Sequence, residues 1–359
     1  MELLTTTDWT EYELIDTGNR EKLERFGKYI LIRPEPQAVW QKSLPESEWE
    51  KLSHARYVRM KGKKTAGDEY ERGSWVRKPK MPDQWTIGYR YKQMNLNFRL
   101  GLTAFGHIGV FPEQAINWNY VYEVVTENAK CKVQSAKCKT GEASADLSRV
   151  TRHASPDDGH VSRVLNLFAY TGGTSLAAKA AGADVVHVDS VKPVITWAKE
   201  MMEASGLDNI RWVVEDAMNF VRREVKRGNI YDGIILDPPA FGRGAKGEVW
   251  KIEKDFLPFL ELIFELMSED ALFLILNGYA AGYSSIAYAQ NLNGLVSKKG
   301  GEIEYGELCI EQDLKEFEKM VGDGTAIGGV GGVVGVDKTS SKKAPILLPC
   351  GITARWKNE

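Results

Sequence analysis

The sequence has 359 residues and contains no long hydrophobic run. A membrane-spanning helix needs a stretch of about 18 apolar residues, and no such stretch is present. Its first residues, MELLTTTDWTEYEL, have neither the basic start nor the apolar segment of a secretory signal. We therefore expect a cytoplasmic protein with no membrane partner.

Cysteine and histidine are also scarce. The four cysteines include no Cys-x-x-Cys pair, and no group of histidines lies near them in the sequence. This spacing predicts neither a zinc site nor a disulfide framework. We expect free thiols and no metal.

A strong positive charge is absent as well, because the formal net charge is -2. This value excludes a uniformly basic nucleic-acid binder but allows a local patch. Residues 56–81 form such a patch, with nine Lys or Arg against three Asp or Glu, and with Tyr57, Tyr70 and Trp75 between them. Cations that contact phosphates and aromatic rings that stack on bases would suit RNA, and a solvated surface loop is the alternative.

The order of polar and apolar segments predicts four parts. Residues 1–83 form a small β-rich module with the basic segment, in which YELI and YILI are strands joined by a polar connection. Residues 84–126 form a β-hairpin followed by a covering segment. Residues 127–160 are polar and are expected to be a long mobile linker, and residues 161–359 form the main domain.

From residue 161 onward, apolar strands alternate with helical segments, beginning with RVLNLF, SLAAKAAG and VVHVD. Continuous apolar strands between helices are typical of a parallel sheet covered on both faces. We therefore predict a doubly wound, Rossmann-like α/β domain. The glycine-rich residues 322–343 are expected to be a flexible loop, because the spacing in GVDKTS does not fit a P-loop.

In such a sheet the ligand lies beyond the carboxyl ends of the strands. The turn after the first strand reads FAYTGGTS, and Gly172 and Gly173 would let the backbone approach a ligand closely, or would serve a tight turn. Asp189 ends the second strand, where it would bind both hydroxyls of a ribose or cap the next helix.

The next two strand ends are also acidic. Asp216 is suited to bind an adenine amine, and Ala217 leaves space for its ring. The segment IILDPPAF is the most specific signal in the chain. Its Asp237 offers a carboxylate, Pro238 and Pro239 fix the backbone without donating hydrogen bonds, and Phe241 offers a flat face to a planar group.

This order of motifs resembles the class I S-adenosylmethionine-dependent methyltransferases. NLFAYTGGTS and DPPAF are similar to the bacterial ribosomal RNA large-subunit methyltransferases that include the 23S rRNA cytosine-C5 enzymes. The resemblance implies S-adenosylmethionine as the cofactor and ribosomal RNA as the partner. It implies cofactor contacts from GHIGVFPEQ and from the strand ends: Gly109, Phe111, Gln114, Phe168, Tyr170, Thr171, Gly172, Gly173, Asp189, Ser190, Asp216, Ala217 and Asp237. Aromatic faces such as Tyr170 would attract the cationic sulfonium.

The sequence departs from the cytosine-C5 members in one turn. Those enzymes carry a nucleophilic cysteine after the fifth strand, whereas residues 276–279 here read Leu-Asn-Gly-Tyr. Cys309 and Cys350 lie downstream of that turn, so we do not expect a covalent route, and a base nitrogen is a better acceptor than cytosine C5. His187 is expected in the core, and His107 is left open as a pocket residue.

We therefore predict a methyltransferase acting on a base of RNA, with Asp237, Pro238, Pro239 and Phe241 holding the acceptor. Three alternatives remain at this point. They are a nicotinamide-dependent oxidoreductase, an RNA-binding protein without turnover, and a methyltransferase of a protein or small-molecule nitrogen.

Overall fold

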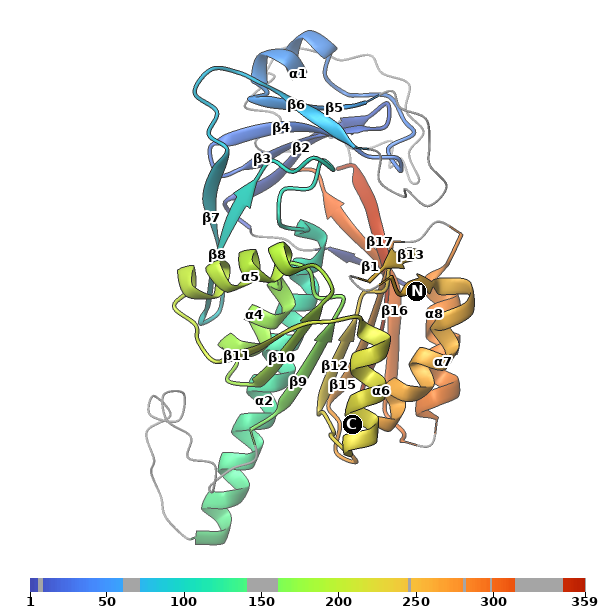
Figure 1. Cartoon of the computed structure of the whole chain (residues 1–359). Coiled ribbons are helices and arrows are strands. Elements are labelled where there is room, and N and C mark those ends of the chain that lie inside the picture. Colours follow the sequence, from blue (N-terminus) through green and yellow to red (C-terminus); the bar gives the residue numbers. More distant parts are fainter. Residues whose placement is uncertain are drawn as a thin grey trace, which may run out of the picture.

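The protein is described by a computed structural model over residues 1–5, 9–60, 72–140, 161–244, 247–279, 282–297, 299–313 and 345–358. A small sheet near the N-terminus lies at one end, and a β-hairpin connects it to a larger α/β body (Figure 1). The glycine-rich residues 322–343 lie outside the described residues, as does Tyr70 of the basic segment.

Eight strands form the central sheet, in the order β1-β16-β17-β15-β12-β9-β10-β11. Five neighbouring strands run parallel: β9 (Arg163–Leu167), β10 (Asp184–Asp189), β11 (Ile210–Val214), β12 (Gly233–Leu236) and β15 (Phe273–Gly278). β17 (Leu347–Lys357) runs antiparallel to β15. This order confirms the predicted doubly wound fold, because the chain turns outward in both directions from β9.

Helices cover both faces of the sheet, as the alternating pattern predicts. Leu176 of α4 and Met201 of α5 share one buried cluster with α2 and the hairpin, whereas Phe220 of α6, Phe259 of α7 and Leu292 of α8 belong to the cluster on the other face. The bounds are α4 Gly173–Ala180, α5 Lys192–Ala204, α6 Ala217–Arg227, α7 Ile252–Glu265 and α8 Ser285–Val296. A short ribbon of β13 (Phe241–Arg243) and β14 (Val249–Lys251) follows β12.

Two strands of this sheet are not predicted from the sequence. β16 (Glu302–Glu311) pairs with β17, and β1 (Glu2–Thr5) adds to β16 in parallel from the opposite end of the chain. Both carry glutamates and lack the continuous apolar run of the inner strands, because they lie toward the edge of the sheet. Because β1 and β16 come from opposite ends of the chain, no pattern within either segment indicates that they pair.

The N-terminal module is a five-stranded sheet with the order β2-β3-β4-β5-β6. Its elements are β2 Tyr12–Gly18, β3 Glu21–Phe26, β4 Tyr29–Pro34, α1 Glu46–Leu52, β5 Ala55–Arg59 and β6 Gly73–Arg77. The strands predicted at YELI and YILI are confirmed. The prediction of a polar connection between them is wrong, because that segment forms strand β3. Its charged residues hide the strand pattern because Lys22 and Glu24 are buried in ion pairs.

The hairpin is confirmed, with β7 at Gln84–Tyr91 and β8 at Met94–Gly101. A 3-10 turn, η1 (Pro112–Gln114), then leads into α2 (Ala115–Thr140). The linker expected from residue 127 therefore does not begin there. The far part of α2 projects from the body (Figure 1), and residues 141–160 lie outside the described residues.

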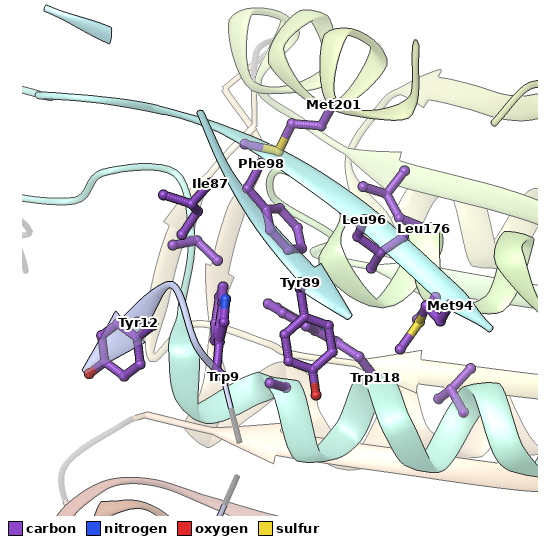
Figure 2. Packing of buried hydrophobic residues seen from close by; sticks show 14 of the residues in the cluster. Trp9, Tyr12, Ile87, Tyr89, Met94, Leu96, Phe98, Trp118, Leu176 and Met201 are labelled. Atoms are coloured by element: carbon purple, nitrogen blue, oxygen red, sulfur yellow. The ribbon is translucent and has the colours of Figure 1, made fainter. Parts of the chain in front are cut away.

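An aromatic cluster joins these parts at Trp118 of α2. The ring centroid of Trp118 lies 4.9 Å from Phe98, 5.4 Å from Tyr89 and 5.7 Å from Trp9. Figure 2 shows Trp9 and Tyr12, from the N-terminal segment, meeting the hairpin residues over α2. The indole of Trp9 also donates a hydrogen bond of 2.7 Å to the carbonyl of Gly88. The N-terminal sheet is thereby held against the body by a buried contact.

Replacing Trp9 with Ala should destabilise the protein by about 3–5 kcal/mol, because the change removes a buried indole and leaves a cavity. Urea denaturation followed by circular dichroism measures this loss. Val39→Ala, at a side chain that is 71% exposed in the same module, is the control. Equal midpoints for the two variants would contradict the anchoring role.

Candidate functional site

A pocket lies at the carboxyl ends of β9, β12 and β15, beneath the segment that leads into α2. It brings together eight of the predicted site residues: Phe111, Gln114, Phe168, Tyr170, Thr171, Gly172, Gly173 and Asp237. Gly109, Asp189, Ser190, Asp216, Ala217, Pro238, Pro239 and Phe241 are not part of its lining. The pocket therefore contains the turn after β9 and the start of the Asp-Pro-Pro turn.

The turn after β9 has an unusual backbone. Phe168, Tyr170 and Gly172 have φ values of 56°, 49° and 84°, and such values are costly for the two aromatic residues. Hydrogen bonds hold the turn in place: the amide of Tyr170 donates to Asp189 Oδ2 at 2.9 Å, and Thr171 Oγ1 donates to the carbonyl of Gly109 at 2.7 Å. The surrounding chain thus fixes the turn before a ligand arrives.

Both glycines of this turn are required by close packing. A Cβ at Gly173 would lie 2.7 Å from the Trp118 ring, and one at Gly172 would lie 3.0 Å from His187 in addition to its left-handed φ. The helix α4 begins directly after Gly172, and Gly172, Gly173 and Thr174 line the pocket, so the start of the helix, with its unpaired amides, lies at the pocket. Gly172 and Gly173 can therefore serve both the tight turn and the close approach of a ligand.

Asp189 lies just behind this turn. Its two carboxylate oxygens accept from the amides of Tyr170 and Val191, each at 2.9 Å. Each oxygen can accept a second hydrogen bond through its further lone pair. The contact with the ribose hydroxyls stays a prediction. Burial raises the pKa of this carboxyl above its usual value, and the hydrogen bonds from backbone amides offset only part of the increase. Ser190, next in the chain, is half-buried.

Asp216 is the N-cap of α6, and its Oδ1 accepts from the amide of Asn219 at 2.9 Å. This role of Asp216 as a helix cap was not predicted from the sequence. Ala217 is buried behind it. The predicted contact with adenine would have to use the second oxygen of Asp216, and it stays a prediction.

Asp237 follows β12 and lies in the pocket wall. Its carboxyl has no hydrogen-bond partner among the described residues, and burial, with a smaller contribution from the charge of Glu113, raises its pKa to about 7. The indole of Trp250 donates to the carbonyl of Pro239 at 2.6 Å and so fixes the turn. Phe241 is half-buried on β13, with the Arg243 guanidinium 5.7 Å from its ring centroid.

Aromatic rings gather along one side of the pocket. Phe111 lies 5.4 Å from Tyr170, 5.8 Å from Tyr279 and 5.3 Å from His107 between ring centroids. Burial and the nearby Arg33 and Lys22 lower the pKa of His107 to about 4, so this ring is neutral. His107 therefore joins the aromatic group at the pocket edge.

A buried amide network supports this side and was missed by sequence reasoning. Asn117 Nδ2 donates to Gln114 Oε1 at 2.8 Å and to Asn277 Oδ1 at 3.0 Å, and Gln114 Nε2 donates to the Tyr279 hydroxyl at 2.8 Å. Arg355 Nε completes it by donating to Asn117 Oδ1. The polar Asn277 at the end of an apolar strand is the one feature of the sequence that could have indicated this network.

The other histidine and the cysteines behave as expected. His187 is fully buried, its Nδ1 lies 3.0 Å from Ser175 Oγ, and burial lowers its pKa to about 3, which confirms a core residue. Burial raises the pKa of Cys309 to about 11 and also raises that of Cys350. Neither thiol is activated as a nucleophile.

Two aromatic residues of the basic segment, Tyr57 and Trp75, lie within the described residues and are engaged in packing. Tyr57 is 5% exposed, its ring packs on Trp75, and both donate hydrogen bonds to the loop before η1, at the carbonyls of Ala104 and Thr103. The stacking role expected for Tyr57 is therefore wrong, whereas Trp75 is half-buried and its stacking role stays a prediction. Both residues hold the loop that covers the pocket, a role with no signature in their own segment.

Two searches of the described part of the chain found nothing further. No helix there is long and apolar enough to cross a membrane. The same part holds no group of three or more His, Cys, Asp or Glu suited to a metal ion.

The pocket fits a cationic ligand better than a dinucleotide. Its lining holds aromatic rings and the Asp237 carboxyl but no Lys or Arg. Aromatic faces and a carboxylate favour a positively charged sulfonium, whereas a pyrophosphate favours basic groups and the glycine pattern that this turn lacks. The residues present therefore fit S-adenosylmethionine.

Comparison with known proteins agrees with this chemistry. The family model of S-adenosylmethionine-dependent methyltransferases matches residues 98–287. A SAM-dependent methyltransferase structure from Agrobacterium tumefaciens is 31% identical, with a TM-score of 0.76, and the match covers 100% of this chain and 94% of that one. The putative methyltransferase SMU.776, solved with SAH, has a similar fold at 18% identity and a TM-score of 0.57, over 98% of this chain and 76% of that one.

Two curated relatives match over shorter regions. Ribosomal RNA large subunit methyltransferase I of Photobacterium profundum is 43% identical over 82 residues, which is 22% of this chain and 21% of that protein. Ribosomal RNA large subunit methyltransferase K/L of Shewanella frigidimarina is 32% identical over 155 residues, which is 41% and 21% of the two chains. The matched regions thus span about a fifth of the length of these relatives.

Replacing Asp189 with Ala should weaken the binding of S-adenosylhomocysteine about tenfold or more, because the change removes a ribose acceptor and the carboxylate that holds Tyr170. Isothermal titration calorimetry measures the affinity. Asp184→Ala, at the other end of the same strand and 57% exposed, should bind as the wild type does. Unchanged affinity in Asp189→Ala would rule out the ribose role.

Proposed function

The chain belongs to the S-adenosylmethionine-dependent methyltransferase family, and from this premise we propose that it methylates a base of RNA, with ribosomal RNA as the expected substrate. The acceptor is a base nitrogen. Gly172, Gly173, Asp189 and Asp216 hold the cofactor, and Asp237, Pro238, Pro239 and Phe241 hold the acceptor.

One observation carries this proposal: the Asp237 carboxyl lies in the pocket wall with no hydrogen-bond partner among the described residues. The residue is half-buried, so its carboxylate oxygens remain available to accept a hydrogen bond from an N–H of the methyl acceptor. The Asp-Pro-Pro turn is held rigid by the bond from Trp250 to Pro239, so the carboxyl is positioned before substrate binds.

The residues of the chain mainly align the reactants. When bound, S-adenosylmethionine supplies a methyl group activated by its sulfonium. The Asp237 carboxylate accepts a hydrogen bond from the acceptor N–H and takes the proton that the nitrogen gives up. In this proposal Phe241 packs against the planar acceptor, and the aromatic group around Phe111 stabilises the positive charge.

A nitrogen acceptor is favoured over carbon C5 because the turn at the end of β15, residues 276–279, contains no cysteine. The turn at the end of β15 holds Asn277 and Tyr279, and Asn277 is engaged in the amide network. Cys309 is buried and Cys350 is half-buried, and both thiols have raised pKa values and do not supply a thiolate. A carbon acceptor would need such a nucleophile, whereas a nitrogen lone pair does not.

Two observations support RNA as the carrier of this base. The curated relatives are named as ribosomal RNA methyltransferases. In addition, an open groove of about 680 Å³ lies between the N-terminal sheet and the hairpin. It is lined by the half-buried rings of Tyr29 and Trp85 and by the cations Arg25 and Lys28, a combination suited to a single strand.

The direct test is methyl transfer from labelled S-adenosylmethionine to ribosomal RNA from cells that lack the gene. We expect incorporation into one methylated nucleoside, which mass mapping then identifies. RNA from wild-type cells is the control, because its site is already modified. Label in a protein or small-molecule fraction, with none in RNA, would contradict the proposed substrate.

The rate of methyl transfer should depend on pH through Asp237. Its pKa of about 7 means that the carboxylate is present above this pH and is lost as the pH falls. We therefore expect a rate that rises with pH to a plateau, with a midpoint at about 7 or lower when the positively charged cofactor is bound.

Asp237→Asn should lower the rate about 100-fold or more and remove this pH dependence, because the amide takes up no proton in this range. Asp184→Asn is the matched control and should keep the wild-type profile. A pH profile in Asp237→Asn that matches the wild type would exclude Asp237 as the proton acceptor.

A further inference from the structure

The amide network beside the pocket decides which hydrogen-bonding groups a ligand meets there. Asn277, at the end of β15, and Gln114, in η1, are both buried and both line the pocket. An amide side chain offers one carbonyl oxygen with two lone pairs and one NH2 group with two hydrogens. The partners that these groups already have in the protein therefore determine what remains for a ligand.

Arg355 of β17 sets the direction of the network. A guanidinium donates hydrogen bonds and accepts none, so the Asn117 atom that lies 2.8 Å from Arg355 Nε is the carbonyl oxygen. Arg355 is held in turn by Glu304, which accepts from its Nη1 at 3.0 Å. The NH2 group of Asn117 is thereby directed toward Gln114 and Asn277, at 2.8 Å and 3.0 Å.

This direction saturates both carbonyl oxygens that border the pocket. Gln114 Oε1 accepts from Asn117 Nδ2 and, at a longer 3.4 Å, from Asn277 Nδ2. Asn277 Oδ1 accepts from Asn117 Nδ2 and, at 2.9 Å, from Thr353 Oγ1. The bonds among the described residues leave one hydrogen on Asn277 Nδ2 and one on Gln114 Nε2, whose other hydrogen goes to the Tyr279 hydroxyl. These two side chains therefore offer donors to a ligand and no acceptor.

A second group of donors belongs to the same pocket. Residues 172–174 line it at the start of α4, where the backbone amides have no partner within the helix. The two groups of donors are close in space, because a Cβ at Gly173 would lie 2.7 Å from the ring of Trp118, the residue that follows Asn117 in α2. The pocket thus presents side-chain and backbone N–H groups together.

The cofactor has one group that matches donors of this kind. S-adenosylmethionine carries a sulfonium, an ammonium and a carboxylate, and of these only the carboxylate is an anion that accepts hydrogen bonds. The start of a helix favours an anion. The ammonium needs acceptors, which Asn277 and Gln114 do not offer, whereas the carboxyl of Asp237 in the same lining suits a positive group.

We propose that Asn277 binds the carboxylate of the methionine part of S-adenosylmethionine through Nδ2, beside Nε2 of Gln114. Arg355 is a positioning residue, which acts through Asn117 and keeps both amides in the donating orientation. The inference rests on the cofactor and not on RNA as the substrate. Neutral amides and the start of α4 then hold the anion in a pocket whose lining contains no Lys or Arg.

Asn277→Asp tests the contact, because Asp keeps the oxygen that accepts from Asn117 and Thr353 but replaces the NH2 donor with a second oxygen. Isothermal titration calorimetry compares S-adenosylhomocysteine with its decarboxylated analogue, which lacks only the carboxylate. We expect the affinity for S-adenosylhomocysteine to fall about tenfold or more, whereas the analogue binds the variant at least as tightly as it binds the wild type. An equal loss for both ligands would overturn the assignment.

Asn128→Asp is the matched control. Asn128 is a half-buried amide of α2 that donates to Ser162 Oγ at 2.9 Å, and it is not part of the pocket lining. This variant should bind both ligands as the wild type does. If Asn277→Asp keeps its affinity for S-adenosylhomocysteine but loses methyl transfer to RNA, Asn277 contacts the substrate instead. The carboxylate assignment is then refuted, and the proposed function stands.

Arg355→Gln tests the positioning role. Gln both donates and accepts, so the amide of Asn117 is no longer restricted to one orientation. We expect a selective loss of affinity for S-adenosylhomocysteine, while binding of the decarboxylated analogue shows that the variant is folded. Arg355→Lys, which only donates, should keep the wild-type preference for S-adenosylhomocysteine. A loss in Arg355→Gln that is the same for both ligands would show a merely structural role.

Discussion

The packing around Trp118 is the constraint on which the other features depend. One face of this indole meets the hairpin and Trp9, and its edge lies against the backbone of Gly173 so closely that no Cβ fits between them. The same side chain forms part of the pocket lining. Helix α2, the hairpin, the N-terminal segment and the turn after β9 are therefore positioned relative to one another by one buried ring.

This constraint explains how a strained turn is maintained. Phe168 and Tyr170 adopt backbone angles that aromatic residues avoid, and the cost is offset by bonds to Asp189 and Gly109 that exist only when β10 and the covering loop are in place. The pocket is preorganised because its walls come from elements that are already packed. Gln114 and Tyr279 are held in the same way, by an amide network that reaches Arg355 on the last strand.

The N-terminal sheet has a part in the site that its composition does not suggest. Tyr57 and Trp75 of its basic segment pack on each other and hold the loop that covers the pocket. Burial of His107, together with the charges of Arg33 and Lys22 in this sheet, lowers the pKa of that histidine. Charge in this module thus acts on the pocket at short range, where burial makes it effective, while the formal net charge of the whole chain stays near zero.

The sequence by itself determined the doubly wound sheet and the places where acidic residues end its strands, because apolar periodicity and chain order are local properties. It also placed Asp237 and the glycine turn in one pocket, since parallel strands share their carboxyl edge. The tertiary contacts, by contrast, were needed to show that Asp216 caps a helix, that Trp118 requires a bare Gly173, and that β1 and β3 are strands. These features depend on contacts between segments far apart in the chain or on buried charges paired across strands, and no periodicity within one segment records them.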